Sequence, residues 1–154
     1  NITILLSSTG SISLPNDAID IVYSNQVMEH LHPEDALDGL KDIYRVLKKG
    51  GAYVCMTPNR WSGPHDISKY FDNVATGLHL QEYTLKELSH IFRQVGFSAV
   101  HVYAGGKGVY LRLPLWMFML VEMILGTLPQ TLSKKISRWY PVRAFLGITV
   151  TAIK

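Results

Sequence analysis

The stretch of sequence that decides the fold runs from Ile19 to Asn59 and reads IDIVYSNQVMEHLHPEDALDGLKDIYRVLKKGGAYVCMTPN. It opens with a mostly apolar run, Ile19 to Tyr23, which is typical of a strand buried on both faces. It closes with a second apolar run, Ala52 to Met56, which predicts another strand. Two strands separated by a helix-length connection favour the strand–helix–strand unit of a parallel sheet.

The segment between these two strands predicts a helix. Pro33 stands at the start, where a missing N–H costs nothing, and acidic residues in the first turn suit the helix dipole. We expect a basic last turn at Lys48 and Lys49 and a stop at Gly50. Apolar residues recur at helical spacing and define one buried face: Leu37, Leu40, Ile43, Tyr44 and Leu47.

Outside this stretch the alternation continues. Thr84 and Glu87 form a capping box at the start of a helix that Gly96 ends. Segment 7–16 reads as a loop, and segment 111–143 reads as a helical insertion before the last strand. The remaining predicted strands are Ile2 to Leu6, Ala99 to Tyr103 and Ile148 to Ile153. The chain is therefore predicted to be a single α/β domain.

Composition fits a globular domain of 154 residues with 47% apolar and 18% charged residues. The single cysteine, Cys55, excludes an internal disulfide framework and a cysteine-based zinc cluster. It favours a cytoplasmic protein. We expect Cys55 itself to be a packed apolar residue. Up to Glu87 the chain has 7 basic and 11 acidic residues, and from Leu88 onward it has 8 basic and 1 acidic. The basic half also holds the most apolar stretch, which favours an anionic membrane or lipid over nucleic acid; a solvated basic face is the alternative.

The segments Ile19 to Asn59 and Gly77 to Phe97 resemble class I S-adenosylmethionine-dependent methyltransferases, with some similarity to ubiquinone-pathway O-methyltransferases. The Glu-His-Leu loop at residues 29–31, the Leu-Lys-x-Gly-Gly helix end at residues 47–51 and the Pro-Asn pair at residues 58–59 carry the resemblance. It implies S-adenosylmethionine as the cofactor. It also implies a Rossmann-like sheet, mainly parallel, with helices on both faces and an antiparallel last strand formed by Ile148 to Ile153.

The family's glycine-rich turn after its first strand is missing from the sequence. Gly105, Gly106 and Gly108 come too late in the chain and read as a turn. We therefore expect residues 1–154 to be an incomplete, C-terminal part of the domain that is inactive alone. On the resemblance, Thr9 lies near the position from which the family contacts adenine.

Three consecutive polar residues, Ser24, Asn25 and Gln26, follow the strand at Ile19 to Tyr23. The resemblance places them at the carboxyl end of that strand, where they would line the cofactor crevice; polar termination of a strand is the alternative. Nearby, Glu29, His30 and His32 form an E-H-x-H pattern. Some ubiquinone-pathway enzymes hold a divalent metal with Glu-x-x-Glu-His, but Gln26 replaces the first Glu here, so we expect no metal and a loop-orienting role for Glu29 and His30.

Two polar segments are candidates for the acceptor site. The loop after the strand at Ala52 to Met56 contains Asn59, Arg60, His65 and Asp66, of which His65 is a candidate general base and the others are candidates for substrate binding. The second segment contains His79, a second candidate base or a structural histidine, together with Glu82 and with Tyr83, a further candidate for substrate binding. An ordinary polar surface loop is the alternative for the first segment.

Residues 113–128 read LPLWMFMLVEMILGTL, a segment that is apolar nearly all round. Its uninterrupted apolar part is too short to span a bilayer, so it is a lid over an apolar acceptor, a dimer interface or a membrane-surface helix. The function that we expect is methyl transfer from S-adenosylmethionine to a small-molecule or lipid-like acceptor, in the full-length protein. The alternative is a non-catalytic association or membrane-docking module. We also expect a homo-oligomer, formed through the strand at Ile19 to Tyr23 or through the apolar segment.

Overall fold

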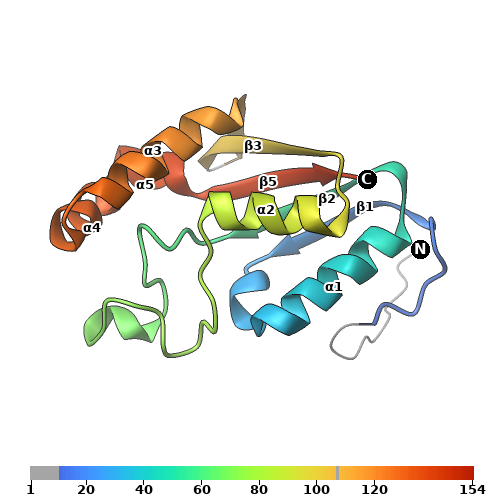
Figure 1. Ribbon diagram of the computed structural model, residues 1–154, viewed down its shortest axis with the longest axis horizontal. Helices are drawn as coiled ribbons and strands as arrows, with labels where there is room; N and C mark the ends of the chain where they lie inside the picture. The colour runs from blue at the N-terminus through green and yellow to red at the C-terminus, as the bar shows by residue number, and fades with distance from the viewer. Residues whose placement is uncertain (1–10, 107) are drawn as a thin grey trace.

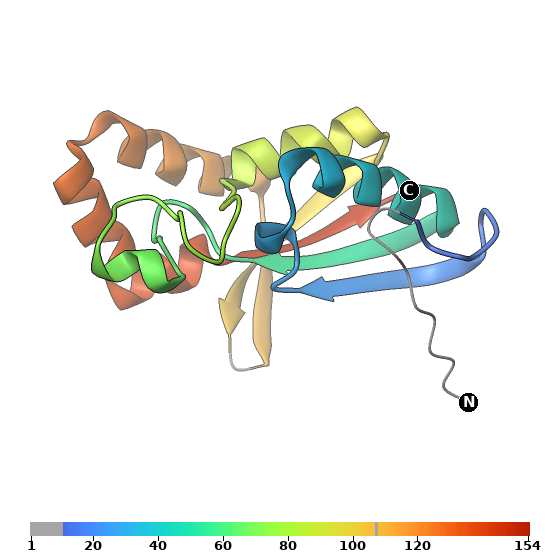
Figure 2. The same ribbon diagram turned by 90° about the horizontal axis from the view of Figure 1, so that it is seen from below.

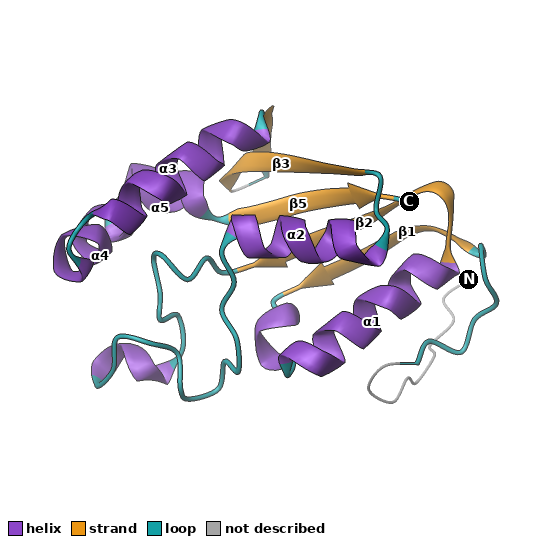
Figure 3. Cartoon of the chain, viewed as in Figure 1, coloured by secondary structure: helices purple, strands orange, loops and turns teal. Residues whose placement is uncertain are grey.

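The computed structural model describes residues 11–106 and 108–154, and within them five strands form one open sheet in the order β1-β2-β5-β3-β4 (Figures 1 and 3). β1 and β2 are parallel, and β5 runs antiparallel to both β2 and β3. The expected antiparallel last strand is therefore confirmed, whereas the predicted strand Ile2 to Leu6 lies outside the described residues. The strands are β1 (Ile19–Asn25), β2 (Leu47–Thr57), β3 (Ala99–Gly106), β4 (Val109–Leu113) and β5 (Ile148–Ile153).

Two helices, α1 (Pro33–Val46) and α2 (Leu85–Val95), lie side by side on one face of the sheet (Figure 2). Pro33 occupies the first turn of α1, and the capping box of Thr84 and Glu87 is formed at the start of α2, as the sequence predicts. The resemblance implied helices on both faces of the sheet. Within the described residues, α1 and α2 share the same face.

The helix end predicted at Lys48 to Gly50 is wrong, because α1 ends at Val46 and these residues belong to β2. The last helical carbonyls find partners outside the helix: the N–H of Asp17 donates to Arg45 and that of Ala18 to Val46. Lys48 instead pairs with Asp20 of β1 at 2.9 Å. Tertiary contacts thus replace the basic last turn and turn the chain directly into the strand.

The core lies between the sheet and the two helices. Leu40 of α1 and Leu88 and Phe92 of α2 are buried against Tyr53 of β2. Cys55 is fully buried in the same layer, and burial raises the pKa of its thiol to about 11. The interpretation of Cys55 as a packed apolar residue is therefore confirmed.

β1 is an edge strand of the described sheet, and its prediction as buried on both faces is wrong. Val22 packs against the core, but Ile21 and Tyr23 point the other way and are 65% and 60% exposed. The apolar run alone could not reveal this, because it reads the same whether one face or both faces are covered.

The predicted insertion at residues 111–143 begins differently from expectation. Leu111 to Leu113 belong to β4, which pairs antiparallel with β3. Gly105 and Gly106, which the sequence placed in a turn, are the last two residues of β3. Three helices then follow: α3 (Leu115–Thr127), α4 (Gln130–Arg138) and α5 (Tyr140–Leu146). They gather beyond the carboxyl ends of β1 and β2 (Figure 1), next to the loops that carry the candidate site residues. Among the helices of the described residues, none is long and apolar enough to cross a membrane.

Candidate functional site

The candidate site lies where β1 and β2 end. The two strands are parallel and pair as far as Asn25 and Met56, so the loops that follow them leave the sheet at the same edge. Open α/β sheets bind their ligands at this edge. The loop after β1 leads into the short 3₁₀ helix η1 (Met28–His30), and the loop after β2 leads into η2 (Ile67–Tyr70).

The three polar residues at the end of β1 adopt different environments. The Ser24 hydroxyl lies 2.7 Å from the Tyr53 hydroxyl, whereas Asn25 and Gln26 are exposed. Gln26 has a φ of 56°, a left-handed conformation, and its N–H donates to the carbonyl of Met56 at 2.8 Å. This bend turns the chain away from the sheet and leaves Asn25 accessible at its edge. Thr9, the fourth candidate for cofactor binding, lies outside the described residues.

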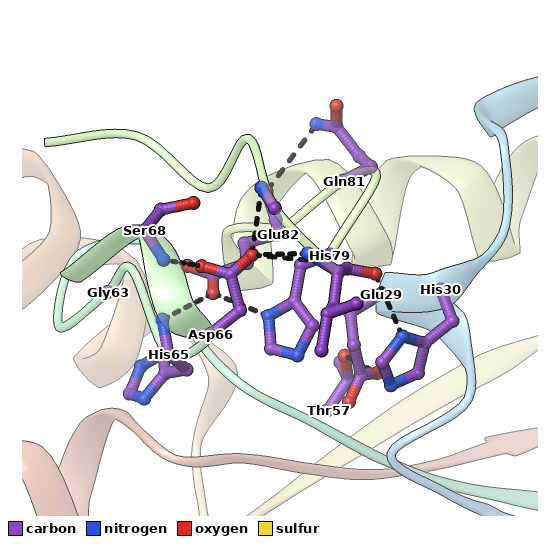
Figure 4. A network of polar contacts seen from close by, with 12 residues as sticks. Glu29, His30, Thr57, Gly63, His65, Asp66, Ser68, His79, Gln81 and Glu82 are labelled. Atoms are coloured by element: carbon purple, nitrogen blue, oxygen red, sulfur yellow. Dashed lines mark hydrogen bonds and ion pairs between the residues drawn. The ribbon is translucent and has the colours of Figure 1, made fainter. Parts of the chain in front are cut away.

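Glu29 is fully buried at the turn that follows (Figure 4). One carboxylate oxygen, Oε2, accepts a hydrogen bond from the Thr57 hydroxyl at 2.8 Å, and the other, Oε1, has no hydrogen-bond partner among the described residues. The main-chain carbonyl of Glu29 accepts the N–H groups of Leu80 and Gln81. These bonds fix the segment before α2 against η1.

His30 and His79 are brought together by that attachment. Their rings pack edge to face with centroids 5.0 Å apart. Nδ1 of His30 lies 3.1 Å from the Leu78 carbonyl, and Nδ1 of His79 lies 2.8 Å from Oε1 of Glu82. Atoms of Glu29, His30 and His79 that could bind a metal all lie within 4.8 Å of one another. His32, the other histidine of the E-H-x-H pattern, is exposed at the start of α1 and makes no side-chain capping bond.

The Asp66 carboxylate holds together the loop that follows β2 and the segment that precedes α2. The carboxylate accepts main-chain N–H groups from Ser68, Gly77, Leu78 and His79 at 2.7–3.2 Å. Burial would raise the pKa of Asp66, but the N–H donors, led by that of His79, outweigh burial and lower the pKa to about 2. All of these bonds serve the fold of the loop, and none of them joins Asp66 to the ring of His65.

Glu82 links the two candidate bases. Its Oε1 accepts the main-chain N–H of His65 at 2.7 Å as well as Nδ1 of His79. The ring of His65 lies 3.0 Å from the Ser62 hydroxyl through Nε2, and its side chain reaches solvent. Partial desolvation nevertheless lowers the pKa of His65, and the nearby Glu82 only partly opposes this. His65 is therefore neutral near physiological pH and able to accept a proton.

Two further candidate residues of this region, Asn59 and Tyr83, have buried side chains. Asn59 is buried, and its amide donates to Glu122 at 2.9 Å and to the Leu146 carbonyl at 3.1 Å. Tyr83 is also buried, and burial raises the pKa of its hydroxyl. Arg60, by contrast, is exposed and pairs with Glu87 at the rim of a cavity.

This cavity of about 480 Å³ lies between the loops and the helices of the insertion. Trp61, Leu125 and Leu128 supply apolar wall, and Arg60, Glu82 and Lys134 supply charge. Its size is typical of a small-ligand site. Helix α3 forms part of the wall through Leu125 and Gly126.

Glu122 was not singled out from the sequence as a functional or structural residue. The structure buries it in α3, where its carboxylate accepts the N–H groups of Leu85 at 2.7 Å and Lys86 at 3.1 Å. Glu122 therefore caps α2 from another helix. A lone carboxylate in an apolar helix was the available signal, because such a group is buried only when it has partners.

Comparison with known proteins gives a consistent result. The profile of a methyltransferase domain family matches residues 7–102. A Mycolicibacterium smegmatis protein named "Probable S-adenosylmethionine-dependent methyltransferase" is 31% identical over 87 residues, which are 56% of this chain and 32% of that protein.

Solved structures show the same fold. A S-adenosylmethionine-dependent methyltransferase from Thermotoga maritima has a TM-score of 0.64 at 14% identity, covering 99% of this chain and 64% of its own. Another, from Archaeoglobus fulgidus, has a TM-score of 0.52 at 21% identity, with coverages of 92% and 62%. The chain thus spans 32% of the length of the curated relative and less than two thirds of either structure.

Proposed function

The chain belongs to the methyltransferase domain family, and from this premise we propose that the protein transfers a methyl group from S-adenosylmethionine to a small-molecule or lipid-like acceptor. The observation that carries the proposal is the family match over residues 7–102, which includes β1, α1, β2 and α2. The loops that carry the candidate bases therefore lie within the matched region, whereas the cavity wall formed by α3 and α4 lies outside it.

On the donor side, we assign contacts to Ser24, Asn25 and Gln26, with Thr9 as a further candidate. The left-handed bend at Gln26 keeps Asn25 exposed at the carboxyl edge of the sheet, where ligands of such folds bind. The 154 residues contain no glycine-rich turn after a first strand. For this reason we expect the chain by itself not to bind S-adenosylmethionine at micromolar concentrations.

On the acceptor side, the cavity beside Arg60 favours a molecule with an apolar body and a polar group. Trp61 and Leu125 would contact the body, while Arg60 and Lys134 would attract an acidic group. Asn59, Asp66 and Tyr83, the other candidates for substrate binding, would act from behind this surface, because their side chains are buried.

The proposed base is His65, with His79 as the second candidate. Methyl transfer is a displacement at a sulfonium carbon, and it needs alignment and, for some acceptors, removal of a proton. The lowered pKa of His65 keeps its ring neutral and ready to accept that proton. His79 is fixed by Glu82 and is less accessible, since only 8% of its surface is exposed.

The test uses the full-length protein with S-adenosylmethionine labelled in its methyl group, incubated separately with extracted lipids and with water-soluble metabolites. We expect label in an acceptor, a large loss of turnover in His65→Ala and a raised KM in Arg60→Ala. His32→Ala is the matched control, because His32 is exposed and lies outside the loops around the cavity. Absence of donor binding and of labelled product would refute the proposed function. Wild-type turnover in both His65→Ala and His79→Ala would refute only the base assignment.

A membrane-docking or association role is the second candidate, favoured by the outer surface of the insertion. Trp116 and Met123 of α3 and Trp139 after α4 are more than 60% exposed, and Lys135 and Arg138 lie on α4. Aromatic and basic residues together suit an anionic lipid surface. Co-sedimentation with phosphatidylglycerol vesicles, reduced in Trp116→Ala and by salt, would support this role. Equal recovery with neutral vesicles would argue against it.

A further inference from the structure

Glu29, His30 and His79 form a cluster of side chains whose role the proposed methyl transfer does not explain. Glu29 and His30 come from η1, and His79 comes from the segment before α2. Their ligand atoms lie within 4.8 Å of one another, a separation that small side-chain movements can close around one ion. Figure 4 shows both imidazole rings beside the Glu29 carboxylate.

The hydrogen bonds of the two rings use Nδ1 and leave Nε2 of each ring free to bind a metal ion. Nδ1 of His30 faces the Leu78 carbonyl and Nδ1 of His79 faces the Glu82 carboxylate, and both of these partners accept. In a neutral ring the proton must therefore sit on Nδ1, and Nε2 keeps its lone pair. A carboxylate or carbonyl behind a histidine is the usual outer partner of a metal ligand, because it holds the ring and raises its basicity.

Glu29 supplies the second, independent observation. Its side chain is fully buried and its Oε1 atom has no hydrogen-bond partner within the described part of the chain, although Oε2 is held by Thr57. A buried carboxylate oxygen is rarely left without a proton donor or a cation. An ion placed between the rings would complete it.

We propose that Glu29, His30 and His79 bind a divalent transition-metal ion of the Zn²⁺ class. Two imidazoles and one carboxylate suit Zn²⁺ and its neighbours rather than Mg²⁺ or Ca²⁺, which prefer oxygen ligands alone. Three protein ligands leave a coordination position for water or for an oxygen of a bound molecule. His30 is exposed, so the ion can enter from solvent.

The sequence predicted no metal site, because Gln26 stands where the first glutamate of the Glu-x-x-Glu-His pattern would bind the ion. The third ligand is instead His79, which is distant in sequence and is brought in by the bonds from Leu80 and Gln81 to Glu29. With the ion bound, Nε2 of His79 is a ligand, and the base role falls to His65. Metal binding does not require methyl transfer, so the two proposals can fail separately.

The experiment is calorimetric titration of the untagged protein with ZnCl₂, followed by gel filtration and measurement of the retained zinc. We expect one equivalent in the wild type, and affinity at least about tenfold weaker in His30→Ala, with Glu82→Gln about 10–100-fold weaker through the outer partner. His32→Ala is the control and should bind as the wild type does.

Thermal melts would show that each variant is folded, and the exposed position of His30 makes its alanine variant the safer one. A wild-type protein that retains no zinc, or a His30→Ala variant with unchanged affinity, would overturn the proposal. So would tighter binding of MgCl₂ than of ZnCl₂ in the same titration.

Discussion

Removing the Glu122 carboxylate should destabilise the protein by separating α2 from α3. Glu122 is 5% exposed, and its carboxylate accepts the N–H groups of Leu85 and Lys86 and the amide of Asn59. In Glu122→Ala, Lys86 can turn to water because it is exposed, and Asn59 keeps the Leu146 carbonyl. The buried N–H of Leu85 has no such replacement.

The expected magnitude follows from these contacts. An unsatisfied buried N–H costs about 1–3 kcal/mol, and loss of a carboxylate at a helix N-terminus costs about 0.3–1 kcal/mol or somewhat more when partly buried. Relief of the carboxylate's own desolvation offsets part of this. We therefore expect a free energy of unfolding lower by about 2–3 kcal/mol, or a melting temperature lower by roughly 4–12 °C at about 2–4 °C per kcal/mol.

Urea denaturation followed by circular dichroism measures this difference, with Glu122→Gln and Glu34→Gln as companions. Glu122→Gln keeps an acceptor for Leu85 and should lose about 1 kcal/mol. Glu34 is exposed in the first turn of α1, so its amide variant should change stability by less than about 0.5 kcal/mol. If Glu122→Ala were as stable as Glu34→Gln, the capping role of Glu122 would be refuted.

Three further outcomes are expected. The pKa of Asp66 is about 2 in the folded protein, below its ordinary 3.8, so the stability that the Asp66 carboxylate contributes is present above pH 3.8 and lost as the pH falls toward 2. After allowance for solvent screening this contribution is about 1–2 kcal/mol. Urea titrations at pH 6 and pH 3 should therefore show that the difference in unfolding free energy between the wild type and Asp66→Asn is smaller at pH 3. Gly63→Ala would place a Cβ 1.9 Å from Oε2 of Glu82 and should cost about 1–3 kcal/mol by thermal melting, whereas Gly39→Ala in the open middle of α1 should stabilise by about 0.5–1 kcal/mol. Tyr23→Lys on the exposed edge strand should reduce self-association in light scattering, and a wild type that stays monomeric at high concentration would contradict the proposed oligomer.

Local signals account for the parts of the fold that the sequence predicted. Thr84 and Glu87 cap α2 because each reaches the main chain of the other within one turn, and Pro33 starts α1 for an equally local reason. β4 was missed because its apolar residues continue almost directly into the apolar α3. Here the hydrophobic pattern changes period within a single run, so it does not mark the boundary.

The candidate site was predictable only in its pieces. Both loops were found because polar residues follow the strands, and His65 and His79 were singled out by residue type. Their relation was not visible, because it rests on main-chain bonds made by residues of ordinary appearance. The main-chain N–H groups of Leu80 and Gln81 donate to the carbonyl of Glu29. The N–H groups of the two preceding residues donate to the Asp66 carboxylate. Contacts of this kind leave no pattern in the sequence.

Glu82 explains why the two loops must be treated as one unit. A single oxygen of its carboxylate accepts both the main-chain N–H of His65 and the ring of His79, so it fixes the position of one candidate base and the tautomer of the other. His79→Ala removes one of these two donors, whereas His65→Ala keeps its main-chain N–H, so only the His79 variant changes the hydrogen bonding of Glu82 directly. A change at Glu82 can shift the loop that carries His65, and effects on neighbouring groups of this kind are not additive. The double variant of His65 and His79, compared with the two single variants, separates the role of the His79 ring from its effect on His65 through Glu82.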